Sequence, residues 1–228
     1  MRLNFLLATA LTTTAGFLVP GVALAQTPFN WSGFYLGIAG GAVDSQASIG
    51  FNGITAVSVP SNVQLPTLGA DGSVKLGYNW QSGQFVYGIE NDLSLVSLHG
   101  SHSGSNYTVT DSLNTLLSMR ARFGVAYDRM MLFATAGVAA GNASFNSDIT
   151  DVGKGTPAQA NGAVMGVVLG GGLEVAVNDN VSLSATGTYY GLSPLTGSGD
   201  IGKAPPNTYN ASYSPHGMVY EAGVNVHF

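Results

Sequence analysis

The chain has 228 residues, of which 8% are charged, 45% are hydrophobic and 32 are glycine, with a net charge of -5. A soluble globular domain carries about 25% charged residues, so this composition argues against an ordinary soluble enzyme, and the high hydrophobic content excludes a disordered chain. The sequence contains no cysteine, which excludes disulfides, thiolate metal sites and cysteine nucleophiles, and it has no cluster of Lys and Arg to neutralise the phosphates of nucleic acid.

The first 25 residues predict a secretory signal peptide. One positive charge at Arg2 precedes a largely apolar stretch, and small residues end at Ala25 as they do before a signal-peptidase cut. Thr9 and Thr12 interrupt the apolar stretch, which falls short of the roughly 20 residues that a transmembrane anchor needs. We therefore expect cleavage after Ala25 and one exported domain over residues 26–228.

The exported part has no apolar stretch of the roughly 18 residues that would indicate a transmembrane helix. Lipid requires every backbone polar group to be paired inside the protein, so a closed β-barrel is the remaining way to span a membrane. Eight segments show the period-two alternation of membrane strands and predict an all-β fold, an eight-stranded antiparallel up-and-down transmembrane β-barrel. They run approximately over 33–43, 72–80, 84–97, 113–127, 130–142, 163–177, 180–190 and 217–228.

Short and long connections alternate between these segments. The short ones are rich in Gly, Asn or Asp and predict tight hairpin turns at 81–83, 128–129 and 178–179. The long ones are polar, rich in Gly, Ser, Asn, Thr and Pro, and predict loops over 44–71, 98–112, 143–162 and 191–216. In a bacterial outer membrane this order places the four loops outside the cell and the turns and both termini in the periplasm.

The alternation also separates a lipid face from a lumen face. In the fourth segment Leu117, Met119 and Phe123 share one face, whereas Arg120 and Arg122 share the other. An Arg or Lys on the lipid face near the midplane would cost about 2 to 4 kcal/mol, so charged residues are expected on the lumen face. The charged residues of the predicted strands all fall on that face: Lys75, Glu90, Asp92, Arg120, Arg122, Glu174 and Glu221.

These charges predict a buried network in the lumen. Glu90 and Asp92 lie about as far from their turn as Arg122 and Arg120 do from theirs, on neighbouring strands. Desolvated charges persist only when they are paired and hydrogen-bonded, and an eight-stranded barrel is just wide enough to be filled by side chains. We therefore expect the network to plug the lumen; the alternative is an ion path through a small-solute channel.

Aromatic residues near the strand ends predict interfacial girdles, with ordinary strand propensity as the alternative explanation. These residues are Trp31, Phe34, Trp80, Phe85, Tyr127, Phe133, Tyr189, Tyr190 and Phe228.

The histidines give only a weak indication of chemistry. His99 and His102 fall in one predicted loop and His216 at the end of another, so a metal or haem contact at the outer rim is conceivable. No cysteine and no tight ligand motif accompanies them, which favours solvated loop histidines. Ser214 and His216 alternate as in a Ser-His hydrolase, but no acidic residue is placed to orient the histidine. We expect no catalytic, cofactor or metal site, and so no enzyme.

Several motifs carry a resemblance to a known family. The stretch Asn30-Trp31-Ser32-Gly33-Phe34-Tyr35-Leu36-Gly37 is followed by Arg120-Ala121-Arg122-Phe123-Gly124, Leu132-Phe133-Ala134-Thr135-Ala136-Gly137 and the terminal Val224-Asn225-Val226-His227-Phe228. These motifs resemble the small alphaproteobacterial outer-membrane β-barrel proteins, the 25/31 kDa porin-like group within the OmpA-like barrels.

The resemblance implies a place in the Gram-negative outer membrane, in contact with lipid and lipopolysaccharide. It implies a structural and surface-interaction role in the cell envelope, with porin-like or haem-binding activity reported for some relatives. The final aromatic, Phe228, resembles the signal that the outer-membrane assembly machinery reads.

Overall fold

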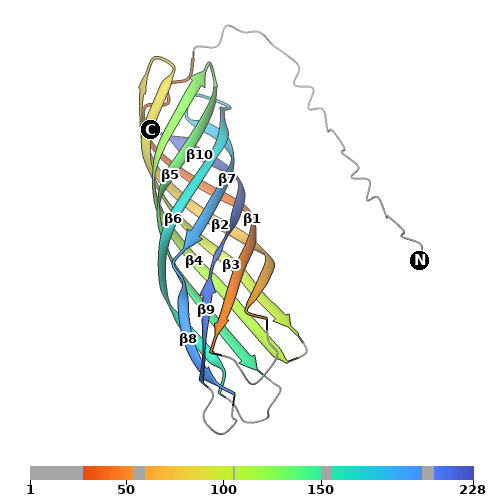
Figure 1. Cartoon of the computed structure of the whole chain (residues 1–228). Coiled ribbons are helices and arrows are strands. Elements are labelled where there is room, and N and C mark those ends of the chain that lie inside the picture. The colour runs from red at the N-terminus through yellow and green to blue at the C-terminus, as the bar shows by residue number, and fades with distance from the viewer. Residues whose placement is uncertain (1–27, 54–59, 105, 150–155, 202–207) are drawn as a thin grey trace, which may run out of the picture.

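The computed structural model describes residues 28–53, 60–104, 106–149, 156–201 and 208–228. The predicted signal peptide therefore lies outside the described residues. Within these residues the chain forms ten β-strands that make one tall, tilted cylinder (Figure 1). The strands are β1 (Gly33–Asn52), β2 (Asn62–Ser82), β3 (Phe85–Ser103), β4 (Tyr107–Tyr127), β5 (Met130–Ile149), β6 (Ala158–Ala176), β7 (Val181–Leu192), β8 (Leu195–Asp200), β9 (Thr208–Ser214) and β10 (His216–His227).

Eight of these strands close a ring. Each pairs antiparallel with its neighbour in the order β1, β2, β3, β4, β5, β6, β7 and β10, and β10 pairs back with β1, as in Leu36 opposite Val226. The predicted eight-stranded antiparallel barrel is thereby confirmed. No helix in the described part of the chain is long and apolar enough to cross a membrane.

The two remaining strands continue the wall of the ring. Strand β9 replaces β10 as the pairing partner of β1, beginning with Ser48 opposite Ser214, and β8 pairs with β9. The interruption falls at Pro215, which has no N–H to donate to a ladder. Its carbonyl instead accepts a hydrogen bond from the N–H of Leu192 at 2.9 Å. The barrel wall thus bends at this point and goes on toward the loops.

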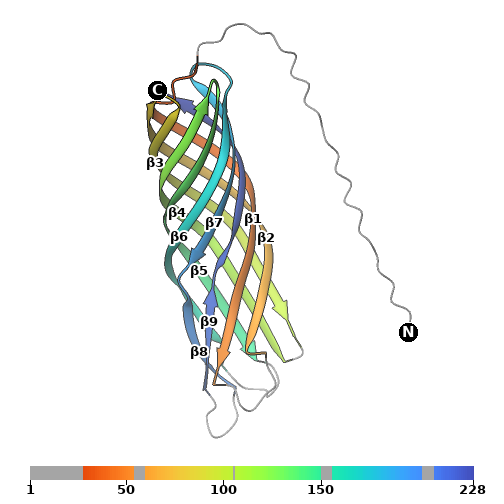
Figure 2. The same ribbon diagram turned by 45° about the horizontal axis from the view of Figure 1, so that its top comes forward.

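The two ends of the barrel differ, as the turn lengths predict. The short turns and the C-terminus gather at the upper end in Figures 1 and 2, which we call the turn end. Left-handed backbone at Gly83 (φ 60°) and Asp128 (φ 58°) makes two of these turns tight. The opposite end, which we call the loop end, carries the tips of the longer hairpins (Figure 2).

The prediction that 44–71, 98–112, 143–162 and 191–216 are loops is wrong for most of their length. Strand β1 runs on to Asn52 and β2 begins at Asn62, and β5 and β6 are extended in the same way. In this part Val43 and Ile49 are buried inside the barrel, whereas Gln46 is exposed outside. The alternation therefore continues, but here the apolar residues face inward and the polar residues face outward. Because these outward residues are small and polar, the strands have the composition of loops.

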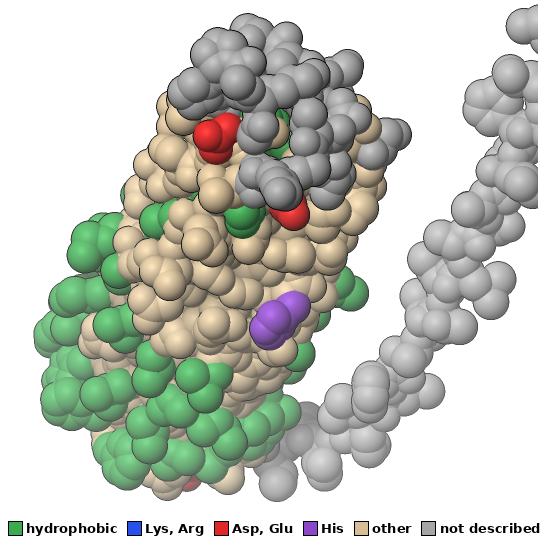
Figure 3. All heavy atoms as spheres, turned by 90° about the horizontal axis from the view of Figure 1, so that it is seen from below, with side chains coloured by type: hydrophobic (Ala, Val, Ile, Leu, Met, Phe, Trp, Pro, Cys, Tyr) green, Lys and Arg blue, Asp and Glu red, His purple; other side chains and the backbone are tan. Residues whose placement is uncertain are grey.

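The barrel consequently has two zones. In the half toward the turn end, apolar side chains point outward, and we call this zone the lipid-facing band; Figure 3 shows them gathered over one part of the surface. Its outward residues include Phe34, Ile38, Leu93, Leu132, Val138, Met165, Leu183 and Val224. Beyond it lies the outer extension, the strand residues at 43–52, 62–67, 97–115, 140–149, 158–164, 192–200 and 208–216. The outer extension has polar residues outside and a packed apolar core inside, built on residues such as Val43, Leu65, Leu98, Phe145 and Tyr213.

Candidate functional site

The ladders of β2, β3 and β4 bring charged residues side by side in the lumen of the lipid-facing band. Lys75 lies directly opposite Asp92, and Glu90 lies directly opposite Arg120. Residues two apart on a strand point to the same face, so Arg122 follows Arg120 into the lumen. All seven predicted network residues face inward and are at most 7% exposed.

The seven residues form one continuous chain of ion pairs across the lumen, in which positive and negative groups alternate. The pairs are Glu221 Oε2 with Lys75 Nζ (2.8 Å), Lys75 Nζ with Asp92 Oδ2 (3.7 Å), Asp92 Oδ2 with Arg120 Nη2 (2.9 Å), Arg120 Nη2 with Glu90 Oε1 (2.8 Å), Glu90 Oε2 with Arg122 Nη1 (3.9 Å), and Arg122 with Glu174. Each cation therefore lies between two carboxylates, which is the pairing that buried charges need.

Neutral residues complete the network at both ends. The side-chain amide of Asn225 donates to Glu174 at 2.7 Å, and the hydroxyl of Ser182 donates to the same carboxylate. At the other end, the Ser73 hydroxyl donates to Glu221. Between them, the Tyr35 hydroxyl donates to Glu90 Oε2 at 2.6 Å. These partners could not be predicted from the sequence, because uncharged residues on the lumen face do not stand out from ordinary alternation.

Two further carboxylates inside the barrel were also missed. Asp71 and Asp111 are buried on the inner face, at 8% and 4% exposure, although both fall in segments predicted to be loops. Asp111 lies in the outer extension, where the Tyr213 hydroxyl donates to its Oδ2 at 3.0 Å. Burial raises the pKa of Asp111, while the hydrogen bond from Tyr213 and the nearby charge of His99 act in the opposite direction.

The lumen around the network is almost full. One cavity lies among Lys75, Glu90, Arg122 and Glu174, and another lies beside Asp92; each has a volume of about 10 Å³. That is roughly the space in which a single water molecule fits. The network is therefore closely packed against its surroundings at these two places.

An apolar cluster closes the lumen at the turn end. Trp31 is fully buried there, and its ring packs edge-on against Phe29 at 4.6 Å between ring centroids. Met131 and Phe133 belong to the same cluster, and the Arg122 guanidinium lies 3.9 Å from the Phe133 ring centroid. The cluster covers the network from the side on which the turns lie.

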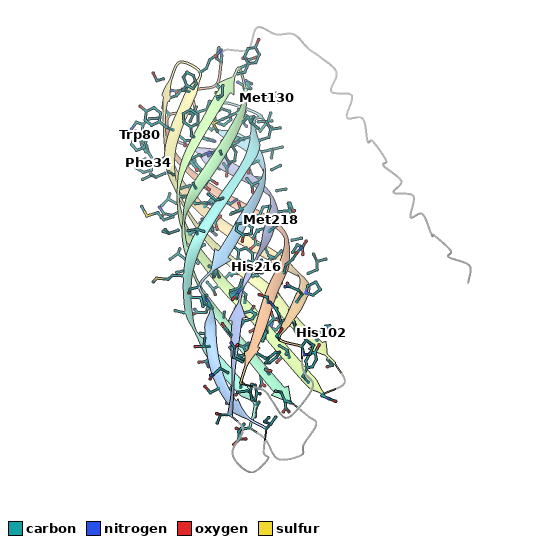
Figure 4. All side chains as sticks on the ribbon, viewed as in Figure 1. Phe34, Trp80, His102, Met130, His216 and Met218 are labelled. Atoms are coloured by element: carbon teal, nitrogen blue, oxygen red, sulfur yellow. The ribbon has the colours of Figure 1, made fainter. Side chains whose placement is uncertain are left out.

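Of the nine residues predicted to form aromatic girdles, six lie on the outside of the barrel and three do not. Trp31, Phe133 and Tyr190 are buried inside the barrel, because each occupies an inward position of the alternation. The other six are exposed on the outside: Phe34, Trp80, Phe85, Tyr127, Tyr189 and Phe228. Figure 4 shows Phe34 and Trp80 pointing outward near the turn end. The Trp80 ring stacks there with the exposed ring of Tyr87, at 5.9 Å between ring centroids.

His99, His102 and His216 do not form a site, whereas His227 is a buried part of the lumen network, with its Nε2 atom 3.2 Å from Glu174 Oε1 and 2.9 Å from Ser182 Oγ. His99 and His102 lie on β3 and not in a loop, and His216 begins β10, so their predicted loop positions are wrong. Figure 4 shows His102 well below His216 along the barrel. The His102 ring contacts the Tyr107 ring, and the Nδ1 atom of His216 lies 3.1 Å from the Ser214 carbonyl oxygen. Among the described residues, no three His, Asp or Glu residues are grouped so that they could hold a metal ion.

A closed antiparallel ring with an apolar outer band and a charged lumen defines an integral outer-membrane β-barrel. No protein-family model matches the chain. It is 32% identical over 153 residues to a 22 kDa outer membrane protein of Rhizobium leguminosarum bv. viciae, covering 67% of this chain and 60% of the relative. It is 28% identical over 173 residues to the 31 kDa outer-membrane immunogenic protein of Brucella melitensis, covering 72% of each chain.

Solved structures share the fold. Outer membrane protein OprG of Pseudomonas aeruginosa has a TM-score of 0.58 and 12% identity, covering 89% of this chain and 99% of that one. Outer membrane protease OmpT of Escherichia coli has a TM-score of 0.50 and 10% identity, with the same coverage. These two structures show the fold alone. The Rhizobium and Brucella relatives make the chain a homologue of alphaproteobacterial outer-membrane proteins, as its motifs predict, and its location is the outer membrane.

Proposed function

We propose that the protein is a closed structural barrel of the outer membrane, whose lumen is sealed and whose loop end presents a surface for interaction. The observation that carries this proposal is the unbroken chain of ion pairs from Glu221 to Glu174 across the lumen. A solute on its way through would have to separate these pairs, and breaking one buried pair costs about 3 to 5 kcal/mol. The two small cavities and the apolar cluster at the turn end support the same conclusion.

We further propose that the protein is not an enzyme and that β10 is its assembly signal. The relatives are named outer membrane proteins, and His99, His102, His216 and Ser214 do not converge with an acidic residue into a catalytic arrangement in the described part of the chain. His227 does contact Ser182 at 2.9 Å and Glu174 at 3.2 Å, but all three residues are buried in the lumen and at most 6% exposed. Phe228 directly follows β10 on the outward side, with Val224 and Val226, and it is 77% exposed. This apolar stripe is available to the outer-membrane assembly machinery before the barrel closes.

Conductance in a planar lipid bilayer tests the closed lumen. The purified barrel is expected to show no reproducible single-channel steps. Steps that change in size with Arg120→Ala or Glu90→Ala would instead support the alternative, a porin-like small-solute channel. Asn91→Ala is the matched control, because Asn91 lies between Glu90 and Asp92 on β3 but points outward.

A further inference from the structure

The outer extension carries a groove on its outward surface. The groove has a volume of about 660 Å³ and crosses four neighbouring strands, β3, β4, β5 and β6. Phe145 and Asp111 also line the groove, but both occupy inward positions and are buried, at 3% and 4% exposure. We call this feature the β3–β6 groove.

The strand register builds the floor of the groove from polar side chains. On one row His99 lies opposite Ser112, Ser112 opposite Ser144, and Ser144 opposite Asn161. Side chains opposite each other on one face are about 5 Å apart, so each row is continuous across the four strands. The next row toward the loop end contains Thr110, Asn146 and Gln159.

These side chains suit sugar hydroxyls better than charged groups. Each Asn and Gln offers both N–H donors and a carbonyl acceptor, and each Ser and Thr offers a hydroxyl that can do either, which is the mixture that a hydroxyl-rich ligand requires. Phosphate and carboxylate ligands are held mainly by Arg and Lys. No Arg or Lys lies in the described residues of the outer extension. The groove therefore matches a neutral saccharide.

The position of the groove indicates where that saccharide comes from. Leu95 on β3 lies four residues from His99 toward the turn end, on the same face, and Met165 on β6 is placed in the same way relative to Asn161. Leu95 and Met165 are 67% and 70% exposed and belong to the lipid-facing band. The groove thus opens on the side of the barrel, directly next to the lipid-facing band on its loop-end side. A glycolipid in the outer leaflet would place its sugars at this height.

We propose that the β3–β6 groove binds the neutral sugar units of an outer-leaflet glycolipid that stands beside the barrel. The proposal deepens the surface-interaction part of the proposed function and depends on the outer-membrane location, but not on the closed lumen. Apart from His99, the groove presents no exposed ring on which a sugar could stack, so binding relies on hydrogen bonds, each of which gains little in competition with water. A lipid-anchored sugar is held beside the groove at high effective concentration, which compensates for weak individual contacts.

The test compares the full barrel with an Asn146→Ala/Gln159→Ala variant in nanodiscs. The nanodiscs contain phospholipid and a small fraction of a two-chain lipid with a neutral oligohexose headgroup, and native mass spectrometry counts the glycolipids that stay bound. Removing two hydrogen-bonding amides is expected to lower the affinity roughly tenfold. The matched control is Asn62→Ala/Gln64→Ala, which removes the same two residue types from exposed outward positions of β2.

Two further ligands serve as controls. The same lipid with its sugar removed is expected to bind equally to all three proteins, and the free oligohexose is expected to bind far more weakly than the glycolipid. Equal glycolipid retention by the barrel and the groove variant would overturn the proposal, as would free oligohexose that binds as tightly as the lipid-anchored sugar. A conducting lumen would leave these results unchanged, so failure of the proposed closure and failure of the groove are distinguishable.

Discussion

Arg120 is the residue on which most of the lumen network converges, since one of its nitrogens bonds both Glu90 and Asp92. In Arg120→Ala these two carboxylates lose their shared cation, and the free energy of unfolding is expected to fall by about 3 to 5 kcal/mol. Urea titration of the barrel folded in lipid vesicles measures this loss. Asn91→Ala, on the outward face of β3 between Glu90 and Asp92, is expected to change stability by less than about 1 kcal/mol. Equal stability of Arg120→Ala and the original protein would contradict a tightly coupled network.

Asp111 gives the outer extension a dependence on pH. Its folded pKa is raised by burial above the unfolded value, so folding favours the protonated form. The stability that this proton provides is complete below the unfolded pKa and is lost as the pH rises through the folded pKa. Asp111→Asn cannot ionise, so its unfolding midpoint in urea is expected to fall less than that of the original protein as the pH is raised across this window. Parallel pH profiles for the two proteins would show that Asp111 ionises without penalty.

At the scale of the strands, the sequence predicts one half of the barrel much better than the other. In the lipid-facing band, lipid permits only apolar side chains outside, so residues such as Leu117 and Arg120 separate cleanly by face. In the outer extension, water tolerates small polar residues outside and the core is apolar, so Gln46 and Ile49 alternate with the opposite polarity. Asp111 was missed as a lumen residue for this reason, and Asp71 because it lies one residue before the predicted start of its strand at 72. The seven charges within the band lie in segments whose alternation is clear.

The outer end of the wall depends on an interaction that no period-two pattern reveals. The Tyr209 hydroxyl on β9 accepts from the Ala158 N–H at 3.0 Å and donates to the Ser147 carbonyl at 2.7 Å, linking β9 to β6 and β5. Tyr209→Phe removes both bonds but keeps the ring in the core. Hydrogen exchange of the Ala158 amide is expected to become at least several-fold faster, because an unsatisfied donor favours local opening. Tyr107→Phe, in the same apolar core, is the control and is expected to leave that amide unchanged.

For the whole molecule, the outward and inward faces have separate tasks. Within the described residues the inward face carries three layers, the apolar cluster at the turn end, the ion pairs in the lipid-facing band and the apolar core of the outer extension. The outward face changes from aromatic girdle to lipid contact to polar wall along the same strands. A barrel of this kind can bind other molecules only at its outward face and its loop end, and the proposed saccharide groove lies on the outward face.

At the scale of the whole barrel, the effect of Phe228 on assembly can be measured separately from its effect on stability. Phe228 and Tyr127 are both aromatic, both 77% exposed and both near the turn end, but only Phe228 directly follows β10. If β10 is read by the assembly machinery, Phe228→Ser is expected to lower the amount of folded barrel in the outer membrane several-fold, whereas Tyr127→Ser is not. Because both side chains are outside the packed interior, the two purified variants are expected to refold in detergent to barrels of equal stability. The measurement is heat-modifiable gel mobility of outer-membrane fractions beside that of refolded protein, and equal amounts of the two variants in the membrane would refute the assembly role of Phe228.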